Sequence, residues 1–186
     1  MAKSLQTFQL DSPVHLLVKF HWNIKQLRSH LTHEDKAAAF YPAVYAAFDA
    51  CITAWQLTDW VWKFSQQDGD VRLGDSELLT GRPLSEYQMW IREHSSDLRI
   101  CQHIANSNKH FGVGKHYNAN IKVVVDWQVE SVFAAGMAVG RPLVDRSWRL
   151  LVNDSGYTHD ILVILERAFR FWAKQIQPSL LSLLDE

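Results

Sequence analysis

The chain has 186 residues, of which 47% are hydrophobic, and its formal net charge is −1. This length fits one domain with a sizeable core that needs no disulfide or metal support. The near-zero charge excludes a global basic field, so nucleic-acid binding would need a local cluster of Lys and Arg. Cys51 and Cys101 are the only cysteines, which is too few for a disulfide framework. We therefore expect buried free thiols in a reducing compartment.

The start of the chain lacks the basic region and apolar run of a signal peptide. No segment approaches the roughly 18 uninterrupted apolar residues of a spanning helix. We therefore expect a cytoplasmic protein that makes no membrane contact.

Two amphipathic helices are predicted in the first third of the chain. The first is capped by Asp11 or Ser12, has Pro13 in its first turn, and carries His21 on its apolar face. Its apolar residues recur at helical spacing: Leu17, Phe20, Ile24, Leu27 and Leu31. The second is entered through Pro42, and its heavy aromatic stripe is formed by Phe48, Ile52, Trp55 and Trp62.

The segment 65–84 carries three glycines, three aspartates and a proline, which predicts a long loop. Two helical segments follow, with a cap at Ser95 or Ser96 between them and a stop at Gly112 and Gly114. Strands are predicted over 121–127 and 147–154, with a possible third over 131–139. A turn is predicted at "NDSG", 153–156.

The last helix is expected to be capped by Thr158. Its apolar seam consists of Ile161, Leu165, Ala168, Trp172 and Ile176. The predicted fold is mainly α (α+β), as one domain over 1–186. It is an up-and-down helical bundle with a long loop at 65–84. A small antiparallel β-hairpin or meander at 119–153 is inserted before the C-terminal helix.

The stretch "RICQHIANSNKHF", 99–111, places polar side chains on one side of a predicted helix. Arg99, His103, Asn106 and His110 fall within about 60° of one another at 100° per residue. They either face water or, together with Lys109, line a cleft that contacts an anion such as phosphate. Histidine is an unusual choice for a purely solvated helix face, because Glu, Lys and Gln are better helix formers there.

This stretch resembles the motif helix of the HEPN superfamily (higher eukaryotes and prokaryotes nucleotide-binding domains). The resemblance implies a helical bundle, commonly dimeric, and many members are metal-independent RNases. Their signature is an arginine, often followed by a polar residue, and a histidine after four to six further residues. Asn106 and His110 match the polar residue and the histidine, but Ala105 stands where the arginine belongs. The only formal match, "RSHLTH" from Arg28 to His33, lies at the end of the first helix.

Across most of its length the chain also resembles a group of bacterial proteins without an assigned activity. The segments that carry this second resemblance are "AFDACITAWQLTDWVW", "ICQHIANSNKHF" and "LERAFRFWAK". We expect a non-catalytic HEPN-like binding module that dimerises through helix faces and binds nucleotide, RNA or a partner protein. The alternative is a metal-independent RNase that uses His103 or His110 with Arg99 at a non-standard spacing. Neither hypothesis calls for a metal or a cofactor.

Asp59 is a further candidate residue for ligand binding. It falls within the aromatic stripe of the second helix, where an ionised carboxylate needs a partner. The candidate partners are His21, Arg99 and His110. Such a contact would be either an internal tie between helices or a ligand-holding Asp–His pair. Trp22 and Trp90 lie off the main apolar stripes, so they are candidates for an exposed stacking surface.

Overall fold

The computed structural model describes residues 10–68, 83–109, 120–131 and 144–185. Its elements in chain order are α1 (Pro13–Leu31), α2 (Lys36–Asp68), α3 (Leu84–His94), α4 (Ser96–Lys109), β1 (Ile121–Ser131), β2 (Val144–Asp154), β3 (Tyr157–Asp160), α5 (Ile161–Ile176) and a closing 3-10 helix η1 (Pro178–Asp185). The fold is therefore mainly helical, with a small antiparallel sheet before the last long helix. This confirms the predicted α+β architecture.

Capping hydrogen bonds explain where the helices α1 and α5 begin. The Ser12 hydroxyl accepts a hydrogen bond from the His15 backbone N–H, and Pro13 occupies the first turn of α1, as predicted. For α5 the prediction was wrong, because Thr158 lies in β3 and the cap is Asp160. The Asp160 carboxylate accepts the Leu162 N–H at 2.8 Å and so satisfies a donor that the first turn leaves open.

The second helix begins earlier and ends later than the sequence pattern indicates. Asp35 caps it by accepting the Ala38 N–H at 2.9 Å, so Pro42 lies inside the helix and does not open it. The helix continues to Asp68, so the first four residues of the predicted 65–84 loop are helical. Residues 69–82 lie outside the described part of the chain.

The buried face of α2 is built from small side chains more than from aromatic ones. Its most buried residues include Ala43, Ala50, Cys51, Ala54 and Leu57, whereas Phe48, Ile52 and Trp62 are only partly buried. Trp55 alone of the predicted aromatic stripe belongs to the buried set. Small side chains allow α1 and α5 to approach α2 closely, which places the bulky rings at the margins of the core.

The sheet has the strand order β1-β2-β3, and both strand pairs are antiparallel. In its register Trp127 lies opposite Trp148 and Val123 lies opposite Val152. The two predicted strands are confirmed, and so is the turn between β2 and β3, where Ser155 and Gly156 both take positive φ values. The third strand of the described sheet is β3. Of the segment 131–139, Ser131 belongs to β1 and the rest lies outside the described residues.

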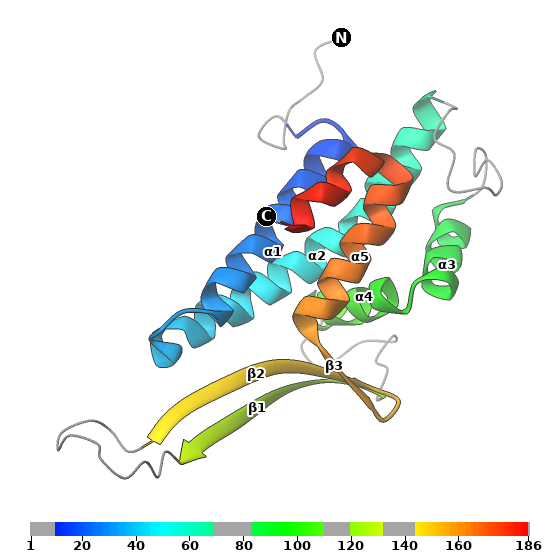
Figure 1. Cartoon of the computed structure of the whole chain (residues 1–186). Coiled ribbons are helices and arrows are strands. Elements are labelled where there is room, and N and C mark those ends of the chain that lie inside the picture. The colour runs from blue at the N-terminus through cyan, green and yellow to red at the C-terminus, as the bar shows by residue number, and fades with distance from the viewer. Residues whose placement is uncertain (1–9, 69–82, 110–119, 132–143, 186) are drawn as a thin grey trace.

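The core lies between α1, α2 and α5, which run side by side above the sheet (Figure 1). Four of the five residues in the predicted α5 seam are buried, and Ile176 is partly buried. Trp172 is completely buried, and its indole Nε1 donates to the Ala54 carbonyl at 2.9 Å. Trp148 anchors the sheet to the bundle, since its Nε1 donates to the Lys36 carbonyl at 2.7 Å.

Among the described residues, one helical stretch is long and apolar enough to cross a membrane by length and composition alone. It is Lys36–Gln66 of α2, and 44% of its most apolar window is buried inside the protein. The core helix of a water-soluble protein passes the same criterion.

Candidate functional site

The predicted site helix, α4, begins next to a serine cap and divides its side chains between the core and the surface. The Ser95 hydroxyl accepts the Leu98 N–H at 3.2 Å, which confirms one of the two predicted caps. Leu98, Ile100, Cys101, Ile104 and Ala105 are buried. Arg99, His103 and Asn106 are half-buried, so they lie at the border between the core and solvent and not on a fully hydrated face.

Arg99 is held by an acidic residue of the sheet. Its Nη2 atom lies 2.7 Å from Oδ2 of Asp154, the last residue of β2, and the two side chains are 36% and 11% exposed. The Ser155 hydroxyl also donates to Asp154, at 3.2 Å. Arg99 Nε is buried and has no hydrogen-bond partner among the described residues. The guanidinium is therefore fixed at the junction of α4 with the β2–β3 turn, with part of it open to solvent.

A second charged group at this junction is Asp97, two residues before Arg99. Its half-buried carboxyl interacts electrostatically with Arg167 of α5 and His159 of β3. Burial raises the pKa of Asp97 above its ordinary value, and the nearby Arg167 and His159 offset part of that increase. Side chains from four elements thus take part in two sets of contacts at the start of α4: Arg99 with Asp154, and Asp97 with Arg167 and His159. We call Asp97, Arg99, Asp154, His159 and Arg167 the junction cluster.

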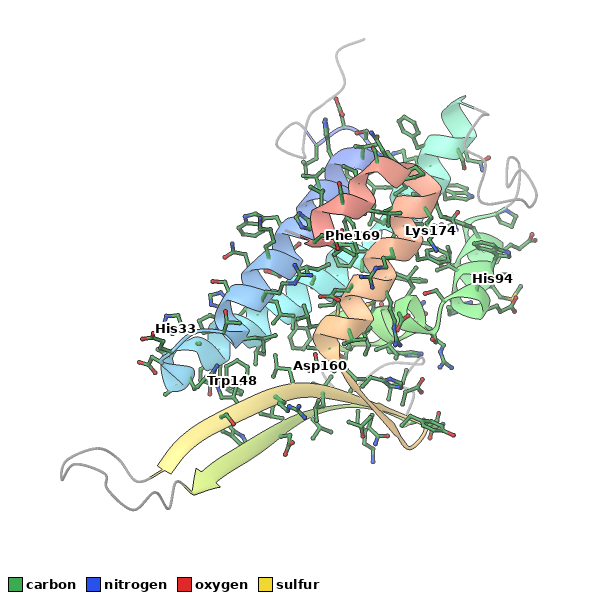
Figure 2. The ribbon with its side chains drawn as sticks, in the orientation of Figure 1. His33, His94, Trp148, Asp160, Phe169 and Lys174 are labelled. Atoms are coloured by element: carbon green, nitrogen blue, oxygen red, sulfur yellow. The ribbon has the colours of Figure 1, made fainter. Side chains whose placement is uncertain are left out.

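The exposed face of α5 carries a row of cationic side chains that begins with Arg167 of the junction cluster. Arg167, Arg170 and Lys174 are all exposed, and their spacing of three and four residues places them on one side of the helix. No described residue forms an ion pair with Arg170 or Lys174. Figure 2 shows Lys174 on the side of α5 where α3 and His94 lie. We call Arg167, Arg170 and Lys174 the α5 basic stripe.

An aromatic stack on α3 lies next to this stripe. The rings of Trp90 and His94 are stacked with their centroids 4.1 Å apart, and Trp90 also contacts Phe171 of α5 at 6.3 Å. Trp90 is partly buried by these contacts, contrary to the prediction that it is exposed. Trp22 is 57% exposed, as predicted, on α1.

The structure brings together only part of the predicted stripe. Arg99, His103 and Asn106 share α4, and His103 takes part in a further contact within the chain. Lys109 is the last residue of α4, but its side chain lies outside the described residues, as does all of His110. The structure therefore describes the side chains of three of the five residues predicted to line the cleft.

Asp59 does not occupy the buried position that the sequence pattern predicted. It is exposed, and its carboxylate accepts a hydrogen bond from Gln88 Nε2 of α3 at 3.1 Å. The buried positions 57, 58 and 61 surround it in sequence, and the helical rotation between them turns Asp59 toward solvent. His21 is instead buried against the Phe169 ring, with the ring centroids 5.7 Å apart.

The formal signature match at Arg28 has a structural role in the fold. Arg28 Nη2 lies 2.9 Å from the Glu166 carboxylate and donates to the Leu184 carbonyl at 3.0 Å. These contacts join α1, α5 and η1. The guanidinium of Arg28 is thus engaged in holding the C-terminal segment against the bundle.

A polar cluster joins α1 to α2 inside the bundle. Lys19 Nζ donates to the Thr53 hydroxyl at 2.6 Å, and that hydroxyl donates to Asn23 Oδ1 at 3.2 Å. Burial lowers the pKa of Lys19, and the nearby Asp49 carboxylate partly opposes this effect. Because each of these groups has a partner within the cluster, the cluster serves to join the two helices.

The two cysteines lie beside each other, as free thiols, on α2 and α4. A hydrogen bond to Cys51, together with burial, raises the pKa of the Cys101 thiol well above its ordinary value. Cys51 also lines an apolar cavity of about 80 Å³ between the helices and the sheet. The prediction of buried free thiols is confirmed.

A larger and more open hollow, about 520 Å³ in volume, lies on the face of the sheet that points away from the helices. It is lined by Asn120, Lys122, Val124, Asn153, Ser155 and Gly156. The junction cluster lies on the opposite face, because Asp154 alternates with Asn153 along β2. No group of three or more potential metal ligands occurs among the described residues.

The chain matches no family model, no curated protein and no solved structure.

Sequence reasoning identified Arg99 but missed the other members of the junction cluster. Asp97 reads as an ordinary acidic residue in a first helical turn, and Asp154 as part of the "NDSG" turn. The one available signal was the "DLR" spacing, which puts a carboxylate and a guanidinium at the same helix start. Their partners come from segments more than 50 residues away, and only the fold brings them together.

Proposed function

We propose that this chain is a non-catalytic RNA-binding module, and that the RNA lies across the junction between α4 and α5. In this proposal Arg99 and the α5 basic stripe contact phosphates, while His103 and Asn106 contact the sugar or base edges. The single observation that carries the proposal is the α5 basic stripe, because two of its three cations form no ion pair with any described residue.

The charge balance of the molecule supports this choice of ligand. The formal net charge of the chain is −1, so a run of exposed cations on one helix is a local feature and not a general property of the surface. Cations that track a phosphate backbone provide most of the sequence-independent affinity for nucleic acids. The stacked Trp90 and His94 rings lie at the α3–α5 contact, where a splayed base could stack on the exposed histidine.

The resemblance of α4 to the HEPN motif helix points to the same class of ligand. The alternative, a metal-independent RNase, would need Arg99 to act on the scissile phosphate. The 2.7 Å ion pair with Asp154 already engages one terminal nitrogen of Arg99. Ala105 stands where the catalytic arginine of the motif belongs, and this absence favours a role in binding over a role in cleavage.

The test is fluorescence anisotropy with a labelled single-stranded RNA over a series of salt concentrations. We expect log K to fall linearly with log salt, with a slope of about −2 to −3 for three or four phosphate contacts. The variant Arg170→Glu/Lys174→Glu should weaken binding at least roughly tenfold and lower the slope. Lys174→Glu alone should also weaken binding, and its matched control is Lys25→Glu, the same change at an exposed position of α1.

Two results would overturn the proposal. One is the absence of RNA binding by the parent protein at low salt, or a loss of affinity in Lys25→Glu equal to that in Lys174→Glu. The other is cleavage of the same RNA in the presence of a chelator, provided that His103→Ala abolishes it, since this would establish the RNase alternative. Binding without cleavage, lost in the α5 variant and retained in the control, would support the proposal.

A further inference from the structure

The strand β1 forms one edge of the sheet and presents apolar side chains to solvent. The strand order β1-β2-β3 gives it a hydrogen-bonded neighbour on one side only, within the described part of the chain. Figure 1 shows β2 next to the helical bundle and β1 on the far side of β2. Val123, Val124 and Trp127 are 54%, 41% and 52% exposed. A long apolar edge of this kind is a template for pairing with another strand.

The hydrogen-bonding pattern defines which backbone groups point outward from this edge. The Ser155 N–H donates to the Asn120 carbonyl at 3.0 Å, so position 120 faces β2. Because successive residues of a strand alternate in direction, positions 122, 124 and 126 also face β2. The N–H and C=O groups of positions 121, 123, 125 and 127 therefore point to the open edge.

Two of the three charged residues of β1 lie symmetrically about Val124. Lys122 lies two residues before it, and Asp126 lies two residues after it. If two copies of β1 pair in antiparallel fashion about a two-fold axis at Val124, Lys122 lies opposite the partner's Asp126, and the reverse pair forms as well. In the same register, Val123 lies opposite the partner's Val125, and both present outward-pointing backbone groups. Neighbouring registers place each charge opposite an uncharged residue.

We infer that β1 is a self-complementary interface, and that two copies of this chain form a dimer by joining their sheets edge to edge. The outward N–H and C=O groups supply the ladder hydrogen bonds, and the two Lys–Asp pairs select the register. This interface differs from the helix-face dimer that the sequence predicted. It does not depend on whether the chain binds RNA.

An aromatic surface beside the edge supplies additional area for the contact. A stable interface buries about 1,200–2,000 Å² in total, which is more than one pair of short strands provides. Trp127 packs on Phe40 of α2, with the ring centroids 5.1 Å apart, and Tyr41 and Tyr45 follow along the helix and are both exposed. The two-fold axis keeps both bundles on the same side of the joined sheet, where these rings lie at the border of the contact.

Charge variants test the register. We expect Lys122→Asp to weaken the dimer at least roughly tenfold in sedimentation equilibrium, because both Lys–Asp pairs become Asp–Asp pairs. The variant Lys122→Asp/Asp126→Lys should restore dimerisation, since the opposite charges are merely exchanged. The matched control is Lys25→Asp on α1. Circular dichroism of each variant checks that the fold is intact, which matters because Asp126 lies opposite Arg149 within its own hairpin.

Disulfide trapping tests the position of the two-fold axis. Val124→Cys places two thiols directly opposite each other in a close, non-hydrogen-bonded pair, so we expect a covalent dimer on mild oxidation. Val123→Cys should cross-link poorly, because its counterpart lies two positions away along the strand. The native Cys51 and Cys101 are buried and so do not compete. The inference would be overturned if the protein were a monomer at every concentration. It would also be overturned by a dimer that Lys122→Asp does not weaken and that Val124→Cys does not cross-link.

Discussion

Arg99 Nη2 and Asp154 Oδ2 lie 2.7 Å apart, and this ion pair ties the start of α4 to the end of β2. It links two segments that are 55 residues apart in sequence. The Asp154 carboxylate is the more buried partner, and it also accepts the Ser155 hydroxyl. The pair therefore sets the orientation of the sheet relative to the proposed binding surface.

Loss of the Asp154 carboxylate should destabilise the fold measurably. We expect Asp154→Ala to lower the free energy of unfolding by about 1–2 kcal/mol, because it leaves the half-buried Arg99 guanidinium with fewer partners. Urea unfolding followed by circular dichroism measures the change. Asp59→Ala is the matched control, since Asp59 is exposed and accepts a single bond from Gln88. Equal losses in the two variants would contradict a special role for the Arg99–Asp154 pair.

Asp97 should make the protein less stable as the pH rises. Because burial raises its pKa above the ordinary value of 3.8, the folded state holds the proton more tightly than the unfolded state. The stabilisation from protonated Asp97 is complete below that ordinary value, and it is lost as the pH rises through the higher pKa of the folded state. Asp97→Asn should therefore be more stable than the parent protein at pH 7.

The measurement for Asp97 is the difference in the free energy of unfolding between Asp97→Asn and the parent at pH 7 and at about pH 4. The advantage of the variant should shrink at the lower pH. An advantage that is the same at both values, or a loss of stability at pH 7, would show that burial does not dominate the environment of Asp97. Asp59→Asn provides the comparison at an exposed carboxyl on α2.

Trp172 is expected to be one of the most sensitive positions of the core. Trp172→Phe removes part of a completely buried side chain and the hydrogen bond from Nε1 to the Ala54 carbonyl. We expect a loss of about 2–4 kcal/mol from the resulting cavity and the lost bond. Trp22→Phe, the same change at an exposed position of α1, should cost less than about 0.5 kcal/mol. The measurement is thermal or urea unfolding of both variants. Equal losses of stability in Trp172→Phe and Trp22→Phe would contradict the described packing of α5 against α2.

The thiols of Cys51 and Cys101 should be unreactive in the native protein. Both are buried, and the pKa of Cys101 is raised by its hydrogen bond to Cys51 and by burial, which suppresses the reactive thiolate. A thiol reagent such as DTNB should label neither residue under native conditions and both residues in urea. Rapid labelling of one thiol in the native state would mean that the α2–α4 contact opens readily.

The sequence by itself determined the helical character of the chain and many of its local boundaries. Ser12 and Pro13 start α1, Ser95 separates α3 from α4, and the turn before Gly156 connects two strands. These features depend on residues close together in the chain, where capping bonds and backbone preferences decide the conformation. The period of the apolar residues also located most of the buried face of α1 and of α5.

The tertiary structure alone decided which polar groups meet. It turned Asp59 toward solvent, brought Asp154 to Arg99, and placed His159 and Arg167 beside Asp97. It also left β1 as an edge strand of the described sheet, with Val124 between two opposite charges. Such contacts depend on how whole elements pack, and a shift of one residue in helix rotation or strand register would change every one of them.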